Sequence, residues 1–254
     1  MAKKKKSLQA TIEAVRASRK RLLTNESPFA IKEAYVKLRT NLMLCMTADK
    51  KRACTSFAVT SAKPSEGKSL TAANIAISYA MLGKKVLLID ADMRKPTQRR
   101  LWRVEKSTGL CDFLARISKL ELEKVKDLPL WIACTGTIPP NPSEQLSSER
   151  MKRFVEESAK VYDYIIIDTP PINTVADAQI VSTYVDGVVL VVKSGDTTAD
   201  ELNEAVDAVR RVGGNLCGTV LNDLNMKSVK NAYKYKYGGK YGYKYAYSEA
   251  YETR

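Results

Sequence analysis

Residues 61–69 read SAKPSEGKS, and they end in Gly67, Lys68 and Ser69, a triplet suited to binding phosphate. In a P-loop the backbone N–H groups surround the phosphates, the lysine reaches the β- and γ-phosphate oxygens, and the serine hydroxyl ligates Mg²⁺. The full motif also has a glycine five residues before Gly67, where this chain has Ala62. The triplet alone is weak evidence, so the prediction of a nucleotide site depends on the residues and elements around it.

Three aspartates follow two apolar runs farther along the chain. Asp90 and Asp92 come after VLLI, and Asp168 comes after III. An aspartate in such a position is often only a turn or helix cap. In a parallel sheet, however, the carboxyl ends of the strands face the crevice where ligands bind, so the three carboxylates can converge beside the phosphates. There Mg²⁺ needs hard oxygen ligands and an attacking hydroxyl needs a base. The pattern predicts a phosphotransferase or ATPase that uses a magnesium-bound nucleotide.

Alternating strands and helices are predicted to position these residues. From about residue 55, short β-branched runs alternate with longer helical stretches, which is typical of an α/β protein with a mainly parallel sheet flanked by helices. Several runs are nearly all apolar, as expected for strands buried on both faces. The predicted strands are 55–60, 85–89, 130–133, 164–168, 187–192 and 217–221, and the predicted helices are 27–46, 69–82, 143–160 and 199–212.

The net charge of +14 is concentrated at the two ends of the chain. Residues 1–24 contain eight Lys or Arg against one Glu, and residues 227–254 contain seven against two. We expect a basic arm over residues 1–27, a core domain over 28–225 and a flexible, disordered tail over 226–254. The chain has five scattered cysteines and no histidine, which favours reduced thiols and excludes histidine-based catalysis and metal sites. No apolar run approaches the roughly 20 residues that cross a bilayer.

The tail ends in YKYKYGGKYGYKYAYSEAYETR and holds eight of the thirteen tyrosines. They are Tyr233, Tyr235, Tyr237, Tyr241, Tyr243, Tyr245, Tyr247 and Tyr251. Aromatic residues between lysines could stack on single-stranded nucleic acid. Such stacking needs a shaped groove, and the tail has too few apolar residues to fold one, so we expect no specific nucleic acid. A low-complexity segment without function is a further alternative.

Together these motifs resemble the bacterial tyrosine kinases (BY-kinases), and in particular the stand-alone cytoplasmic kinases of capsular and exopolysaccharide operons. The resemblance rests on PSEGKS, DADMR, IIIDTPP and the tyrosine-rich tail, and it covers almost the whole chain. It implies a P-loop NTPase fold of the partition-ATPase-like class. It also implies an ATP- and Mg²⁺-dependent protein-tyrosine kinase that autophosphorylates its tail between subunits and regulates polysaccharide synthesis and export.

The same resemblance implies partners and a location. A membrane adaptor of the polysaccharide co-polymerase type would recruit the cytoplasmic kinase to the inner face of the membrane and activate it. A cognate tyrosine phosphatase would reverse the modification. As a phosphoacceptor the tail is physically reasonable, because its lysines attract it to an acidic, nucleotide-loaded crevice. Each phosphate adds a charge of about −1.5 to −2 and would weaken that attraction.

The resemblance also implies roles for individual residues. Lys68 and Ser69 would hold phosphate and Mg²⁺, Asp92 and Asp168 would serve the metal and its waters, and Asp90 would be the base or orienting group for the tyrosine hydroxyl. Asp90 and Asp92 could exchange these roles. The residues expected to bind the nucleotide are Lys63, Pro64, Ser65, Glu66, Gly67, Lys68, Ser69, Leu70 and, on the adenine side, Asn222.

Asn222 and Asp177 each have an alternative explanation. Asn222 is equally well explained as a turn residue that ends a strand. Asp177 could support the loop after Asp168, but an acidic residue at the start of a helix is the simpler explanation.

The chain departs from the family at several positions. The family usually has glycine at Ser65, and a serine tolerates poorly the positive φ that a glycine permits. Threonine is common at Leu70. The helix that packs family members into a ring often reads E-x-x-R-x-x-R; Glu33 and Arg39 match it, whereas Val36 replaces the middle arginine. We expect Glu33 and Arg39 at the interface of a homo-oligomer, with an ordinary exposed helix face as the alternative.

The main alternative function is that of a partition or septum-positioning ATPase, which switches between monomer and dimer on DNA or membrane. These proteins carry a second P-loop lysine where Lys63 stands. The basic N-terminus would then contact membrane or DNA. The tyrosine-rich tail favours the kinase, because a switch ATPase has no use for eight tyrosines.

Overall fold

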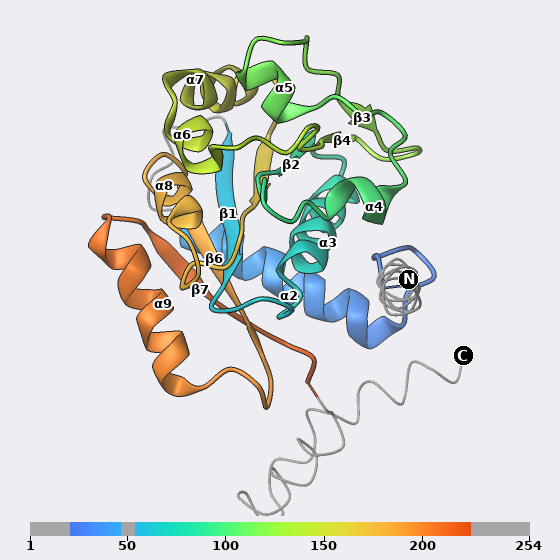
Figure 1. Ribbon diagram of the computed structural model, residues 1–254. Coiled ribbons are helices and arrows are strands. Elements are labelled where there is room, and N and C mark those ends of the chain that lie inside the picture. The colour runs from blue at the N-terminus through green and yellow to red at the C-terminus, as the bar shows by residue number, and fades with distance from the viewer. Residues whose placement is uncertain (1–20, 47–53, 225–254) are drawn as a thin grey trace, which may run out of the picture.

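The computed structural model describes residues 21–46 and 54–224 (Figure 1). The eight tail tyrosines and most of the predicted basic arm therefore lie outside the described residues. Among the residues described, no helix is long and apolar enough to span a bilayer.

A seven-stranded sheet forms the centre of the fold, in the order β3-β4-β2-β5-β1-β6-β7. Every neighbouring pair is parallel except β3 and β4, which are antiparallel. The strands are β1 Thr55–Ser61, β2 Val86–Asp90, β3 Glu123–Lys124, β4 Leu130–Ala133, β5 Tyr164–Asp168, β6 Gly187–Lys193 and β7 Leu216–Asn222. Six of the seven are the predicted strands, with ends shifted by one residue at most.

Helices cover both faces of this sheet. Figure 1 shows α8 and α9 on one side of it and α3 on the other. The helices in the described residues are α2 Phe29–Met46, α3 Lys68–Ala80, α4 Gln98–Trp102, α5 Leu110–Leu114, α6 Pro142–Ser147, α7 Glu149–Ser158, α8 Asp177–Ser182 and α9 Ala199–Arg211.

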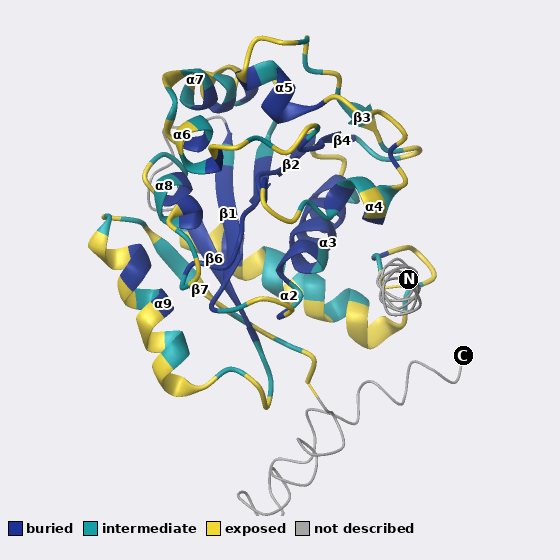
Figure 2. Ribbon diagram, in the orientation of Figure 1, coloured by how far each residue is buried: buried dark blue, intermediate teal, exposed yellow. Residues whose placement is uncertain are grey.

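Alternate side chains of the central strands enter two apolar clusters. In β5, Ile165 and Ile167 belong to one cluster and Ile166 to the other, because successive side chains of a strand point to opposite faces. The first cluster includes residues of α7, α8 and α9, and the second includes residues of α2 and α3. Burial on both faces explains why the strand sequences are almost entirely apolar; Figure 2 shows these strands and α3 as the buried centre.

The prediction of one continuous helix over residues 143–160 is wrong at Ser148. This residue has φ −66° and ψ 146°, which is extended backbone, and it separates α6 from α7. Its hydroxyl accepts a hydrogen bond from the Met151 N–H at 3.2 Å and so caps α7. Serine is favoured at such N-cap positions and is less favourable inside helices. The elements β3, α4 and α5 were not predicted, because they are too short to show periodicity, and α8 was indicated only by Asp177 as an acidic residue at a helix start.

The described end of the predicted basic arm packs on the domain. Leu23 is 5% exposed, and its N–H donates a hydrogen bond to Asn74 of α3 at 2.8 Å. The Asn74 amide in turn donates to the Arg21 carbonyl at 3.0 Å and contacts the Tyr35 hydroxyl of α2 at 3.0 Å. Residues from Arg21 onward are thus joined to α2 and α3 through one asparagine.

Candidate active site

The P-loop connects β1 to the N-terminus of α3, which begins at Lys68. Gly67 has φ 91°, and a Cβ atom there would lie 2.1 Å from Nδ2 of Asn222. That amide donates a hydrogen bond to the Glu66 carbonyl at 2.8 Å. Asn222 ends β7, so the last strand of the sheet contacts the P-loop backbone directly. The helix N-terminus beyond Gly67 adds the positive end of its dipole to the loop.

Ser65 adopts a backbone conformation that favours glycine. Its φ is 69°, in the left-handed region. A residue with a Cβ atom pays about 1–2 kcal/mol for this conformation. The loop therefore keeps the geometry expected of a glycine at this position, at a cost to the stability of the folded chain.

The strand register places two of the three predicted aspartates side by side. Asp90 ends β2 and Asp168 ends β5, and the two residues are register partners in the parallel pair. Both are fully buried, and Asp92 is 4% exposed. The convergence predicted for the carboxyl ends of these strands is confirmed for this pair.

Lys68 lies between the carboxylates. Its Nζ is 2.7 Å from Oδ2 of Asp92 and 3.7 Å from Oδ1 of Asp168. Burial alone would lower the pKa of Lys68, but the negative charges of Asp168 and Asp92 raise it above its ordinary value. The lysine therefore carries a positive charge at the start of α3, where it can bind phosphate oxygens.

Gln98 joins three of the motifs, and the sequence did not reveal it. Its side-chain Nε2 donates to Oδ2 of Asp168 and to the Ser69 carbonyl, both at 2.9 Å. Its backbone N–H donates to Oδ2 of Asp90 at 2.9 Å. Gln98 is fully buried at the start of α4. The available signal in the sequence is that Gln98 follows Asp90 and then Pro96 and Thr97. That pattern indicates the start of a helix rather than a functional residue.

Two carboxylate oxygens in this cluster are buried without a hydrogen-bond partner among the described residues: Oδ1 of Asp90 and Oδ1 of Asp168. Burial raises the pKa of Asp90 well above its usual range, and the charge of Asp168 raises it further. Burial also raises the pKa of Asp168, although Lys68 opposes that shift. The unpaired oxygen of Asp168 fits a Mg²⁺ ion, which takes one or two carboxylates together with phosphate oxygens and waters, and that of Asp90 is free to accept a proton. The described residues contain no group of three or more Cys, Asp or Glu side chains placed to hold a metal.

Arg94 is held by Asp177 at the edge of the site. The Arg94 guanidinium donates two hydrogen bonds to the Asp177 carboxylate, at 2.8 and 3.1 Å. The Ser143 hydroxyl donates to the same carboxylate at 2.6 Å. Asp177 is fully buried as the first residue of α8, so it both begins a helix and fixes the arginine of the DADMR motif. The sequence indicated Asp177 but not its partner Arg94.

Lys63 contacts the start of α9 and the segment before it. Its Nζ is 3.1 Å from Oε2 of Glu201 and donates to the Asp196 carbonyl at 2.8 Å. Its backbone N–H donates to the Glu66 carboxylate at 2.9 Å, and that carboxylate also accepts from the Thr197 hydroxyl. These contacts tie the P-loop to the segment before α9.

The two residues expected at an oligomer interface lie on α2. The Arg39 guanidinium donates to the Ser78 carbonyl of α3 at 2.6 Å. Glu33 is half-buried on the same helix. Arg39 thus also fixes α2 on α3, and the interface stays a prediction.

Comparisons with known proteins identify the family. A family profile described as ParA, NUBPL iron-transfer P-loop NTPase, matches residues 53–252. Tyrosine-protein kinase YwqD of Bacillus subtilis is 43% identical over 192 residues, which cover 75% of this chain and 80% of that kinase. The chain belongs to the bacterial tyrosine kinases.

Two further relatives agree. The putative tyrosine-protein kinase CapB of Staphylococcus aureus is 34% identical to this kinase over 207 residues, covering 81% of this chain and 90% of CapB. The crystal structure of the chimerical protein CapA2B2 superposes with a TM-score of 0.75 at 36% identity, covering 81% of this chain and 90% of that one. The predicted fold class, nucleotide use and protein-tyrosine kinase activity are confirmed, whereas the roles of the individual site residues stay predictions.

Replacing Asp90 with asparagine is expected to stabilise the ligand-free kinase by about 0.5–2 kcal/mol at neutral pH. The change removes a buried charge at a functional site, where function rather than stability sets the residue. The raised pKa of Asp90 means that folding disfavours its charged form, and the amide carries no charge. The gain should shrink as the pH falls toward that raised pKa, because the folded wild-type carboxyl then takes up a proton. Urea unfolding at several pH values measures the difference. Asp207→Asn on exposed α9 is the control and should change stability by less than about 0.5 kcal/mol; an Asp90→Asn chain less stable than wild type would contradict the prediction.

Proposed function

We propose that this kinase transfers the γ-phosphate of ATP to the tyrosines of its own tail, from one subunit to another. The observation that carries the proposal is the presence of two features in one chain. One is the buried site of Lys68, Asp90 and Asp168, and the other is a tail with eight tyrosines. An acidic crevice loaded with nucleotide and a basic tail have complementary charge.

The residues of the site would divide the work as follows. Lys68 would stabilise the charge on the β- and γ-phosphates, and the P-loop N–H groups would orient them. A bound Mg²⁺, held by Ser69 with Asp168 and Asp92, would neutralise charge on the same oxygens. Asp90 would accept the proton of the tyrosine hydroxyl while the tyrosine oxygen bonds to the γ-phosphorus and ADP leaves. Its raised pKa suits this role, because a stronger base takes the proton more readily. Asn222 would lie beside the nucleotide through its contact with the P-loop.

Transfer between subunits is supported by the outer surface of α2. Ile31 and Met43 are 44% and 38% exposed, and Phe29 and Leu44 are 39% and 64% exposed, although large apolar side chains are usually covered. A second copy packed on this helix would cover them. It would also bring Glu33 to an interface and place one subunit's tail near another subunit's site.

We also propose that the kinase acts in the synthesis and export of a capsular or exopolysaccharide. A membrane adaptor of the polysaccharide co-polymerase type would recruit it to the inner face of the membrane, and a tyrosine phosphatase would reverse its modification. The support is the likeness to CapB and to the chimerical protein CapA2B2. The domain division into an arm over 1–27, a kinase domain over 28–225 and a substrate tail over 226–254 belongs to the same proposal.

A mixing experiment tests transfer between subunits. One partner is a Lys68→Met chain with an intact tail, and the other is an active chain whose eight tail tyrosines are phenylalanine. With Mg²⁺ and ATP, phosphotyrosine should appear on the Lys68→Met chain, which cannot label itself. Mass spectrometry of the two chains, distinguished by a size tag, locates the label. If the mixture stays unlabelled while wild type labels itself, transfer occurs within one chain and the proposal of transfer between subunits is wrong.

A further inference from the structure

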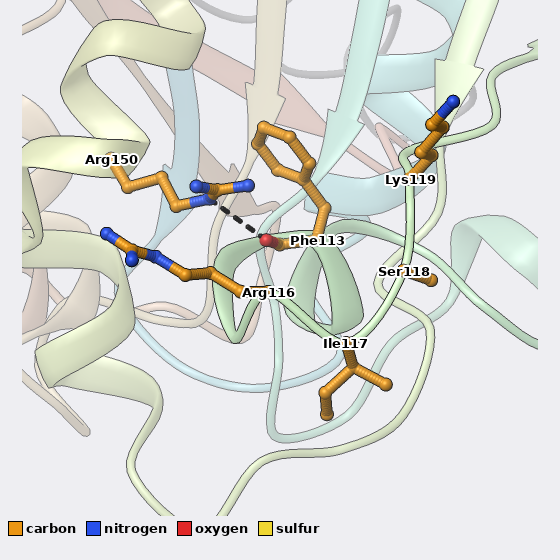
Figure 3. Close-up of a pocket in the computed structure, with 6 residues that line it drawn as sticks. All are labelled: Phe113, Arg116, Ile117, Ser118, Lys119 and Arg150. Carbon is orange, nitrogen blue, oxygen red and sulfur yellow. Dashed lines mark hydrogen bonds between the residues drawn. The ribbon is translucent and has the colours of Figure 1, made fainter.

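A basic hollow lies between α5 and α7, formed by residues that the catalytic proposal does not use. Its volume is about 460 Å³, within the range of small-ligand sites, and it is lined by Phe113, Arg116, Ile117, Ser118, Lys119 and Arg150 (Figure 3). Three of these side chains are cations and none is an acid. The site would therefore attract an anion rather than a neutral ligand.

Arg150 is held against Phe113, which lines the hollow. Its guanidinium lies 4.3 Å from the centroid of the Phe113 ring, and its Nε donates to the Phe113 carbonyl at 3.0 Å. Figure 3 shows the side chain reaching from α7 to this ring and carbonyl, with Arg116 below it in the view. Within the described residues the Nη atoms of Arg150 donate no hydrogen bond, so they stay available for a ligand. An arginine held in place in this way loses little freedom when it binds an anion.

Arg116 supplies a second guanidinium without a partner. Its backbone has φ 63°, the left-handed region, at the end of α5. Within the described residues its side chain is exposed and makes no ion pair or hydrogen bond. Planar guanidinium groups suit phosphate because they donate two hydrogen bonds at once.

A second hollow of about 420 Å³ shares Phe113, Arg116 and Arg150 and adds Arg153 and Phe154. Its two acidic residues are paired with lysines that do not line it. Glu149 is 2.8 Å from Lys152, and Glu157 is 2.6 Å from Lys160. The positive charge of the arginines is therefore only partly compensated. Phe113 lines both hollows, and the centroid of its ring lies 5.7 Å from that of Phe154, which lines the second.

We propose that this surface binds phosphotyrosine in the last part of the kinase's own tail, residues 243–254, and so retains the product of autophosphorylation. The two arginines match the phosphate, and the phenylalanine rings match the tyrosine ring. Residues 243–254 contain Tyr247 and Tyr251 and the only two acidic residues of the tail, Glu249 and Glu252. The proposal rests on the proposed function, because that function supplies the phosphate.

Synthetic peptides test the binding without requiring kinase activity. The full-length kinase, treated with a tyrosine phosphatase and kept free of ATP, is titrated into a fluorescent peptide of residues 243–254 phosphorylated at Tyr247 and Tyr251. Binding should be at least about tenfold tighter than that of the unmodified peptide, since each charge-assisted pair is worth about tenfold or more in affinity. A peptide of residues 231–240 phosphorylated at Tyr235 and Tyr237 is the matched control with the same number of phosphates; lysines lie beside both phosphotyrosines, and it should bind more weakly.

Variants assign the binding to this surface. Arg116→Gln removes an exposed charge with no structural partner and should weaken binding of the phosphorylated 243–254 peptide roughly tenfold. Arg150→Lys keeps a charge but loses the planar group, and it should also weaken binding. Arg210→Gln, on exposed α9, should have no effect. Phenyl phosphate should displace the peptide at lower concentration than inorganic phosphate.

Several results would overturn the proposal. They are equal binding of modified and unmodified peptides, unchanged binding by both Arg116→Gln and Arg150→Lys, and equal displacement by phenyl phosphate and inorganic phosphate, which would show a simple anion site. The proposed function fails separately, since a kinase that does not label its tail can still bind the synthetic phosphopeptide. A kinase that labels its tail but binds no phosphopeptide would leave the proposed function intact and refute this inference.

Discussion

Replacing Lys68 with methionine is expected to reduce the rate of tyrosine phosphorylation by roughly 100- to 1000-fold, the effect typical of losing one group that stabilises transition-state charge. Lys68 is the first residue of the helix after the P-loop, and its positive charge lies in a buried site. Methionine has a similar length but no charge, so it cannot offset charge on the β- and γ-phosphates. Quantitative mass spectrometry of phosphotyrosine after incubation with Mg²⁺ and ATP measures the loss.

The structure adds a consequence for stability. Without Lys68 the carboxylates of Asp92 and Asp168 lose their cation in a buried site, which is strongly destabilising where no other group compensates. We expect the Lys68→Met chain to fold but to unfold at a lower temperature, with a smaller deficit at acidic pH, where the Asp168 carboxyl, whose pKa burial raises, takes up a proton. Lys160→Met on the surface should leave both activity and stability nearly unchanged. Full activity of Lys68→Met would refute the assignment of the P-loop.

Replacing all eight tail tyrosines with phenylalanine is expected to remove nearly all phosphotyrosine while leaving nucleotide binding unchanged. The five other tyrosines lie in the folded domain: Tyr35, Tyr79, Tyr162, Tyr164 and Tyr184. Each is buried or half-buried, and burial raises the pKa of each hydroxyl. A hydroxyl in such a position can enter an active site only after local unfolding, so the tail is the accessible substrate.

Binding of a fluorescent ATP analogue measures whether the nucleotide site of this variant is intact. Tyr162→Phe is the matched control, because it removes one half-buried hydroxyl of the domain, and it should leave the labelling at the wild-type level. Strong labelling that persists in the variant without tail tyrosines would show that the tail is not the main acceptor.

Much of the fold was predictable from sequence because its signals are local. The runs VLLI and III are apolar at every position, which identifies strands buried on both faces whatever their neighbours are. The P-loop residues are adjacent in the chain, and the helix after them begins where the motif requires it. The short α4 and α5 carry no comparable signal, α8 carries only an acidic first residue, and Ser148 breaks a helix that the surrounding pattern favours.

By itself the sequence determined the family, the P-loop, six strands and the tyrosine-rich tail. Only the tertiary structure decided which groups meet: Asp90 with Asp168 across a strand pair, Gln98 with Asp168 and Ser69, Arg94 with Asp177, and Arg150 with Phe113 at a basic hollow. These partners are separated by tens of residues. The order and register of the strands bring them together, and both follow from packing two apolar faces at once, a condition that no short stretch of sequence records.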